Sequence, residues 1–215
     1  MIVLELGGNM FNRKCKITFI SHGSTVHSEE SRLSDKDHYP PINDAGEEEI
    51  EKICEWLKKR AIKNDVIYSS TALRTIQSAE MISKVFKKEV EMLDGLHPRK
   101  RGVWSGLTFD QIENKYPQML DRLHENPCSY CPECGETVLE FNKRVSKILK
   151  NVVEENIGNR IIIVTHPEVI QAAVSKAIKL PPKHQAKVYI KTGSATQISY
   201  FDSWASLVYS GYVPL

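Results

Sequence analysis

The sequence lacks several features that would place it in a specialised class of protein. Unbroken apolar runs such as Ile161 to Val164 are far shorter than the ~20 residues that a membrane span needs. Five cysteines in 215 residues are too few for a disulfide scaffold. Lys+Arg is 29 and Asp+Glu is 27, so no excess of one charge predicts binding to nucleic acid or to a membrane. A composition of 41% hydrophobic and 26% charged residues argues against disorder and fibrous repeats.

The first residues also lack the pattern of a secretory signal. Met1 to Gly8 has no basic region, and its apolar stretch is too short for a signal peptide. We therefore expect a cytoplasmic protein in a reducing compartment. The run from Ile2 to Leu6 could pair as an edge strand, which would allow a homodimer.

Strand-like and helix-like segments alternate along the chain. Strands are predicted at 16–20, 65–68, 90–93 and 160–165, and two paired late strands at 187–191 and 196–200. Apolar residues at helical spacing predict helices at 47–63, 72–87, 138–156 and 169–178. This alternation predicts a single α/β domain over residues 1–215, a three-layer α/β/α sandwich around a mostly parallel sheet.

Two of the predicted strands end in a histidine, and a third leads to an arginine. The histidines are His22, in Ser21-His22-Gly23, and His166, in Thr165-His166-Pro167, and the arginine is Arg74. In a parallel sheet these positions meet at the carboxyl edge, where ligands usually bind. A neutral imidazole can attack phosphorus, and a guanidinium matches phosphate oxygens. The three residues therefore predict a site that handles phosphate; the alternative is that each histidine is structural.

Five segments, in order, carry a recognisable set of motifs. They are ITFISHGST at 17–25, INDAG at 42–46, YSSTALRTIQSA at 68–79, GET at 135–137 with Arg144 beyond it, and IIIVTHP at 161–167. In this order they resemble the histidine phosphatase superfamily, in its phosphoglycerate mutase-like branch. The resemblance implies the fold of that family and phosphoryl chemistry without a metal. It also implies that His22 is the nucleophile that becomes phosphohistidine, and that Arg74 and His166 bind phosphate. The substrate-binding positions implied by the first motif are Ser21, Gly23 and Thr25.

The sequence departs from the family pattern at three positions. Ser21 stands where the family has an arginine that clamps phosphate. Pro98, four residues before Gly102, stands where the family usually has the glutamate that protonates the leaving group. Pro167 replaces the common glycine after the second histidine. A charge-assisted contact is worth about 1.5–3 kcal/mol, and leaving-group protonation about 10²–10⁴-fold in rate, so the losses at 21 and 98 bear on activity.

Residues near these positions are candidate replacements. Arg99 and Arg101 lie in a basic run that should border the pocket, and we expect them to bind substrate; the alternative is a solvated basic loop. Glu168, two residues after the second histidine, resembles the proton donor of the acid phosphatase branch and is the candidate catalytic acid. The alternative for Glu168 is a contact with the dipole of the helix that it begins.

Three hypotheses of function remain open. The first is a phosphatase that hydrolyses a phosphate monoester through phosphohistidine. The second is a catalytically impaired member that binds a phosphorylated or other anionic small molecule. The third is a scaffold that serves non-phosphoryl chemistry or an interaction. The presence of His22, Arg74 and His166 favours the first two.

Three of the five cysteines lie in the expected lid, an insertion at about 108–134. Cys131-Pro132-Glu133-Cys134-Gly135 resembles a zinc knuckle, for which Cys128 would be the third ligand and His124 the fourth. An iron–sulfur cluster is an alternative metal site, and free thiols or a disulfide formed on handling are the alternatives without metal. A bound zinc would be structural, since the expected catalysis needs no cofactor.

Overall fold

A six-stranded sheet forms the centre of the protein. The computed structural model describes residues 13–35 and 40–215. The strands are β1 (Arg13–Ser21), β2 (Val66–Ser70), β3 (Val90–Leu93), β4 (Arg160–Thr165), β5 (Ala195–Phe201) and β6 (Ala205–Tyr212). Their order across the sheet is β3-β2-β4-β1-β5-β6. The pairs β3–β2, β2–β4 and β4–β1 are parallel, whereas β1–β5 and β5–β6 are antiparallel, so the predicted mostly parallel sheet is confirmed.

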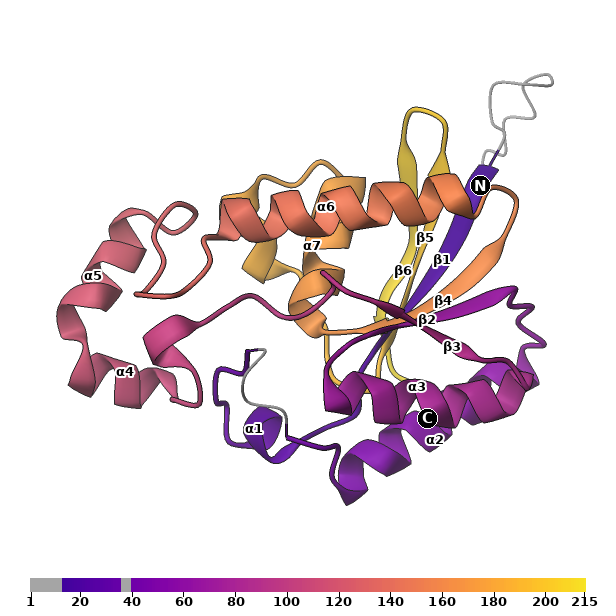
Figure 1. Ribbon diagram of the computed structural model, residues 1–215, viewed down its shortest axis with the longest axis horizontal. Coiled ribbons are helices and arrows are strands. Elements are labelled where there is room, and N and C mark those ends of the chain that lie inside the picture. Colours follow the sequence, from indigo (N-terminus) through magenta and orange to yellow (C-terminus); the bar gives the residue numbers. More distant parts are fainter. Residues whose placement is uncertain (1–12, 36–39) are drawn as a thin grey trace.

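Helices cover both faces of this sheet (Figure 1). α2 (Asp44–Lys59) and α3 (Leu73–Phe86) pack on one face, and α6 (Val138–Glu155) and α7 (Pro167–Ala177) on the other. β1 shows why both faces are buried, because Ile17 and Phe19 belong to the α6–α7 core while Ile20 belongs to the α2–α3 core. The three-layer sandwich is therefore confirmed.

α6 illustrates how the sequence specifies one layer. Thr137 caps its first turn in a reciprocal capping box with Glu140. Phe141, Val145 and Leu149 recur every four residues and are at most 5% exposed. Burial of a large apolar side chain stabilises a fold by about 1.5–3 kcal/mol, so this stripe fixes the helix on the sheet.

The remaining short elements lie near the carboxyl ends of the strands or away from the sheet. They are α1 (Val26–Glu29), the 3-10 turn η1 (Gly102–Trp104), α4 (Phe109–Lys115), α5 (Pro117–Glu125) and the 3-10 turn η2 (Pro182–Lys187). α4 and α5 project from the body in the expected lid segment (Figure 1). Among the described helices, none has the length and apolar character that crossing a membrane requires.

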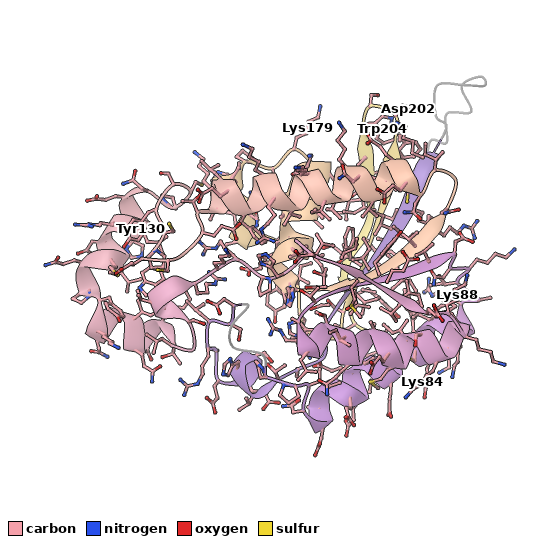
Figure 2. The ribbon with its side chains drawn as sticks, in the orientation of Figure 1. Lys84, Lys88, Tyr130, Lys179, Asp202 and Trp204 are labelled. Carbon is pink, nitrogen blue, oxygen red and sulfur yellow. The ribbon has the colours of Figure 1, made fainter. Side chains whose placement is uncertain are left out.

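Of the two paired late strands that were predicted, the strand at 187–191 is wrong, whereas the strand at 196–200 is observed as β5. Residues 188–191 form no strand, and β5 pairs instead with β6. Gly193 does not close a hairpin, because its N–H donates to the carbonyl of His22. The hairpin turn comes later, where the stacked rings of Phe201 and Trp204 lie 4.2 Å apart between centroids; Figure 2 marks Trp204 at this tip. The edge strand expected at 2–6 lies outside the described residues, so the homodimer stays a prediction.

Candidate active site

A cavity of about 250 Å³ lies at the carboxyl ends of β1 and β4. The predicted residues that line it are His22, Thr25, Arg74, Arg101, His166 and Glu168. Parallel pairing of β1 with β4 places Ser21 opposite Thr165, so the two histidines that follow them are neighbours. Their ring centroids are 5.3 Å apart, and the planes meet at 66°. The sheet therefore brings together side chains that are far apart in the sequence, as the motif order implies.

His22 is held in one protonation state. Its Nδ1 lies 2.8 Å from the Gly23 carbonyl oxygen, and Arg74 Nε donates to its Nε2 at 3.2 Å. A carbonyl oxygen can only accept, so Nδ1 carries the proton and Nε2 presents a lone pair. Burial, and secondarily the Arg74 charge, lowers the pKa of His22 from 6.5 to about 3. His22 is consequently a neutral imidazole whose unprotonated Nε2 accepts from the Arg74 guanidinium. A histidine nucleophile needs this protonation state, and attack on a ligand would use the lone pair that Arg74 now engages.

His166 is the second imidazole of the cavity. Its Nε2 lies 3.1 Å from Ser70 Oγ at the end of β2, and its side chain is 1% exposed. Burial lowers its pKa well below 6.5, and the Arg74 charge lowers it further. Its Nδ1 is buried and finds no hydrogen-bond partner among the described residues. An unpaired buried nitrogen costs free energy, so an entering ligand that pairs with it would gain affinity.

The backbone around His22 is fixed by packing with α2. A Cβ on Gly23 would lie 2.4 Å from the carbonyl oxygen of Gly46, so the loop and the helix touch only because both residues are glycine. The Gly23 N–H donates to Ser78 Oγ on α3. Packing against α2 therefore requires a glycine at position 23. Glu49, which the sequence analysis did not single out, accepts from the backbone N–H and hydroxyl of Ser24 and ties this loop to α2.

The other predicted substrate-binding residues lie in different surroundings. Thr25 lines the cavity and caps α1 through Ser28. Ser21 is fully buried, and its Oγ forms no hydrogen bond within the part of the chain that the structure describes. Arg101 lines the cavity, whereas Arg99 Nη1 donates to the carbonyl of Glu136. Burial, followed by the charge of Arg101, lowers the pKa of Arg99 to about 10.

Glu168 reaches the segment where the family usually carries its acid. Its Oε1 accepts from the backbone N–H of Arg99, and its Oε2 accepts from Arg101 Nη2 at 2.6 Å. The side chains of Arg101 and Glu168 are only 16% and 18% exposed. Glu168 therefore stands beside Pro98 and Arg101 in the cavity, but both of its oxygens act as acceptors.

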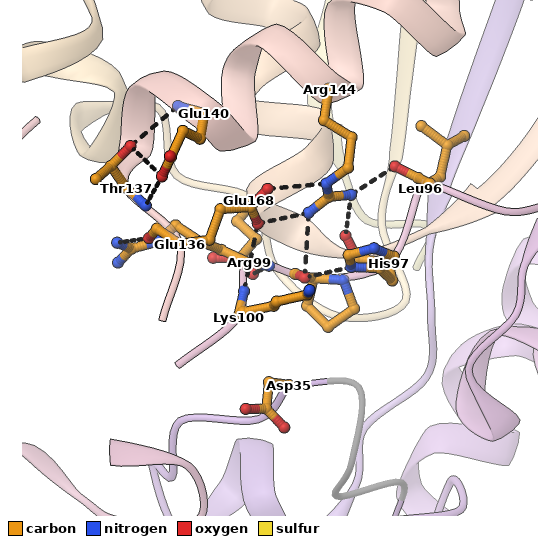
Figure 3. A network of polar contacts seen from close by, with 12 residues as sticks. Asp35, Leu96, His97, Arg99, Lys100, Glu136, Thr137, Glu140, Arg144 and Glu168 are labelled. Atoms are coloured by element: carbon orange, nitrogen blue, oxygen red, sulfur yellow. Dashed lines mark hydrogen bonds and ion pairs between the residues drawn. The ribbon is translucent and has the colours of Figure 1, made fainter. Parts of the chain in front are cut away.

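Arg144 fixes the segment around Pro98 through several hydrogen bonds. Its guanidinium pairs with both carboxylate oxygens of Glu136, at 2.9 and 2.7 Å, and donates to the carbonyl of His97 (Figure 3). It also donates to the carbonyls of Gly95 and Pro98. A planar fork with several fixed acceptors limits the movement of a loop. In the sequence, Arg144 stands out only because it follows the GET motif. That position does not indicate its hydrogen bonds to the segment around Pro98.

The cysteine loop packs on η1 through its backbone. Gly102 has φ +53°, and a Cβ there would lie 1.9 Å from the Glu133 carbonyl oxygen. Val103 N–H donates to that same carbonyl, and residue 135 forms a bridge with Arg101. Cys128 and Cys131 are half-buried and Cys134 is exposed. Across the described ranges no three His, Cys, Asp or Glu side chains are placed to hold a metal, so zinc on these cysteines and His124 stays a prediction.

Comparisons with known proteins agree with the fold and the motif order. Residues 17–211 match the family model described as histidine phosphatase superfamily (branch 1). Phosphoglycerate mutase-like protein 4 of Arabidopsis thaliana is 27% identical over 165 residues, which are 75% of this chain and 70% of that protein. Phosphoserine phosphatase 1 of Hydrogenobacter thermophilus is 27% identical over 127 residues, 59% of each chain. The solved structure of Bacillus stearothermophilus YhfR has a TM-score of 0.85 at 23% identity, covering 93% of this chain and 98% of that one, which shows a shared fold.

Proposed function

Because the chain belongs to the histidine phosphatase superfamily, branch 1, we propose that it hydrolyses a small phosphate monoester through a phosphohistidine at His22. The observation that carries the proposal is the state of His22. Its Nδ1 is bonded to a carbonyl, its pKa is lowered to about 3, and its Nε2 faces Arg74 at 3.2 Å in a cavity open to a ligand.

The chemistry proceeds in two displacements. In the first, the Nε2 lone pair attacks phosphorus, the bond from phosphorus to the ester oxygen breaks, and the alcohol leaves with a proton donated by an acidic group of the site. In the second, water gives a proton back to that group and attacks the phosphorus, the bond to Nε2 breaks, and inorganic phosphate leaves. Arg74, which donates to His22, would offset the charge on the non-bridging oxygens in both steps, and His166, whose ring lies 5.3 Å from that of His22, would bind another oxygen.

Arg101 and Glu168 would take over the two functions missing at Ser21 and Pro98. For this, Arg101 must exchange the Glu168 carboxylate for the phosphate of the substrate. Glu168 would then lose one of its two donors, and its Oε2 could carry the proton that the leaving alcohol needs. Ser21, Gly23 and Thr25 would shape the loop around the phosphate without adding charge.

A second candidate function is anion binding without efficient turnover. The arrangement of Glu168 favours it, because both of its oxygens accept hydrogen bonds from the Arg99 backbone and from Arg101. The lack of a guanidinium at position 21 favours it as well. In this case Arg74 and His166 would still bind a phosphorylated small molecule.

Turnover of one substrate and formation of a phosphoprotein test the proposal. We expect the wild-type protein to hydrolyse p-nitrophenyl phosphate and to form an acid-labile phosphoprotein, and His22→Ala to lose both. His184→Ala, in η2, is the matched control and should keep both. Phosphate binding that needs Arg74, without turnover, would support the second candidate. If the protein shows no turnover and binds no phosphate, both candidate functions are refuted, and a scaffold used for other chemistry is favoured.

A further inference from the structure

The two displacements at His22 make no use of the buried hydroxyl of Ser70. Ser70 ends β2, is fully buried, and lies outside the set of residues that line the cavity. β2 pairs in parallel with β4, with Ser69 opposite Val164, so Ser70 lies beside the residues that follow β4. Its Oγ is 3.1 Å from His166 Nε2, and among the described residues this is the hydroxyl's one hydrogen bond.

The contact between Ser70 and His166 can be made in two ways. Either the serine hydroxyl donates its proton to an unprotonated Nε2, or a protonated Nε2 donates to the serine oxygen. The imidazole is neutral in both, because burial, and then the Arg74 charge, lowers the pKa of His166 well below 6.5. A neutral imidazole carries one proton, so the direction of this hydrogen bond decides whether Nδ1 is protonated.

The two arrangements differ in how many buried polar groups they leave without a partner. If Nε2 donates, the Ser70 hydroxyl proton has no acceptor and the Nδ1 lone pair of His166 has no donor within the described parts of the chain. If the hydroxyl donates, Ser70 is satisfied, and the N–H at Nδ1 alone lacks a partner. Buried polar groups without partners are unfavourable, so the structure favours donation by Ser70.

Donation by Ser70 leaves the imidazole proton on Nδ1 of His166. His166 is the N-cap residue of α7, but its side chain makes no hydrogen bond to that helix. Its ring lines the cavity, 5.3 Å from the ring of His22 between centroids. A protonated Nδ1 can donate to a phosphate oxygen, which only accepts hydrogen bonds, whereas a lone pair at the same place would repel that oxygen.

We propose that Ser70 is a positioning residue that holds His166 in the tautomer with its proton on Nδ1, so that His166 donates a hydrogen bond to the transferred phosphoryl group. The donor role rests on the proposed function, since it requires phosphate in the cavity. The two histidines then have opposite roles. The Gly23 carbonyl leaves a lone pair on Nε2 of His22, whereas the Ser70 hydroxyl leaves a proton on Nδ1 of His166. One imidazole can attack phosphorus, and the other offsets charge on its oxygens.

Nitrogen NMR of the wild-type protein labelled at histidine observes the tautomer directly. The His166 signals are assigned by their loss in His166→Gln. At neutral pH we expect a protonated Nδ1 and an unprotonated Nε2 in the wild-type protein. In Ser70→Ala neither ring nitrogen keeps a partner, so we expect a mixture of the two tautomers. His22 should keep its proton on Nδ1 in both proteins, because the Gly23 carbonyl is unchanged.

Titration with inorganic phosphate then tests the donor role without requiring turnover. Saturating phosphate should return His166 to the Nδ1-protonated tautomer in Ser70→Ala, because this form alone donates to the anion. An even mixture of tautomers lowers the apparent affinity for phosphate about twofold relative to the wild-type protein. Ser175→Ala is the matched control. It removes a buried hydroxyl on α7 that has no partner among the described residues, and should leave tautomer and affinity unchanged.

The spectrum of the wild-type protein needs no variant and can overturn the proposal by itself. A protonated Nε2 on His166 would do so, as would a Ser70→Ala spectrum that keeps the wild-type tautomer. A mixture in Ser70→Ala that phosphate does not shift would refute the donor role. If the wild-type protein binds no phosphate, the donor role and the proposed function both fail. If it binds phosphate with Nε2 protonated, the assignment of Ser70 fails alone.

Discussion

Replacing Glu168 by glutamine removes one negative charge from the candidate active site while keeping the size of the side chain. Oε1 and Oε2 each accept a hydrogen bond, from Arg99 N–H and Arg101 Nη2. A glutamine has one carbonyl oxygen and one NH2 group, so one of these donors loses its acceptor. Loss of a hydrogen bond to a charged group costs about 1.5–3 kcal/mol, and we expect the free energy of unfolding to fall by that amount.

The effect on catalysis depends on the leaving group. If Glu168 protonates the departing oxygen, hydrolysis of an alkyl phosphate should fall about 10²–10⁴-fold in kcat in Glu168→Gln. A p-nitrophenolate leaves without a proton, so its release should fall by less than about tenfold. The measurement is the ratio of the two rates in the variant, divided by the same ratio in the wild-type protein.

Glu136→Gln supplies the control for this experiment. Glu136 is a carboxylate of comparable burial, 12% exposed, that pairs with Arg144 behind the Pro98 segment. Its loss should loosen that segment and slow both substrates in the same proportion. If Glu168→Gln also slows both substrates equally, then Glu168 only positions Arg101, and its assignment as the acid is refuted.

Three further predictions concern the histidine, its loop and the cysteines. Because burial lowers the pKa of His22 from 6.5 to about 3, the unfolded chain binds a proton between these pH values that the folded chain does not. The stabilisation due to this group should therefore be lost as pH falls, by about 2 kcal/mol from pH 7 to pH 5. In urea unfolding, the free energy of unfolding of His22→Ala should fall with pH by that much less than in the wild-type protein. In Gly46→Ala the new Cβ would lie 2.3 Å from the Ser24 carbonyl oxygen, so we expect lower kcat/KM and lower Tm; an unchanged kcat/KM would contradict the packing argument. Zinc held by the cysteine loop would appear as one equivalent in elemental analysis and disappear in Cys131→Ser; zinc that stays would exclude these ligands.

Much of the fold could be predicted because the buried elements have strong patterns. The apolar run at 160–165 is observed as β4 with the predicted bounds, since a strand buried on both faces needs apolar side chains throughout. The strand at 90–93 also matches. Two histidines at strand ends predicted the site, because parallel strands bring their carboxyl ends to one edge of the sheet.

The missed features depend on contacts that no local pattern contains. β6 is an edge strand whose half-buried and exposed residues alternate from residue 207 to 212, but Val208 and Tyr212 are large hydrophobic residues on the exposed face, so the sequence itself shows no clear period of two. The contact of Arg101 with Glu168 joins residues 67 positions apart. The sequence suggested both residues as separate replacements, but their mutual pairing depends on how the Pro98 segment folds over α7.

That pairing changes what the two replacements mean for the candidate active site. A guanidinium that belongs to position 21 in the family would be free to meet phosphate, whereas Arg101 is held by a carboxylate at 2.6 Å. Phosphate must therefore compete with Glu168 for Arg101, and part of the Coulomb energy gained with the ligand is lost with the carboxylate. The competition predicts that Glu168→Ala should bind inorganic phosphate more tightly than the wild-type protein while turning over alkyl phosphates more slowly. Opposite changes in affinity and turnover would arise because one side chain both neutralises the clamp and supplies the proton.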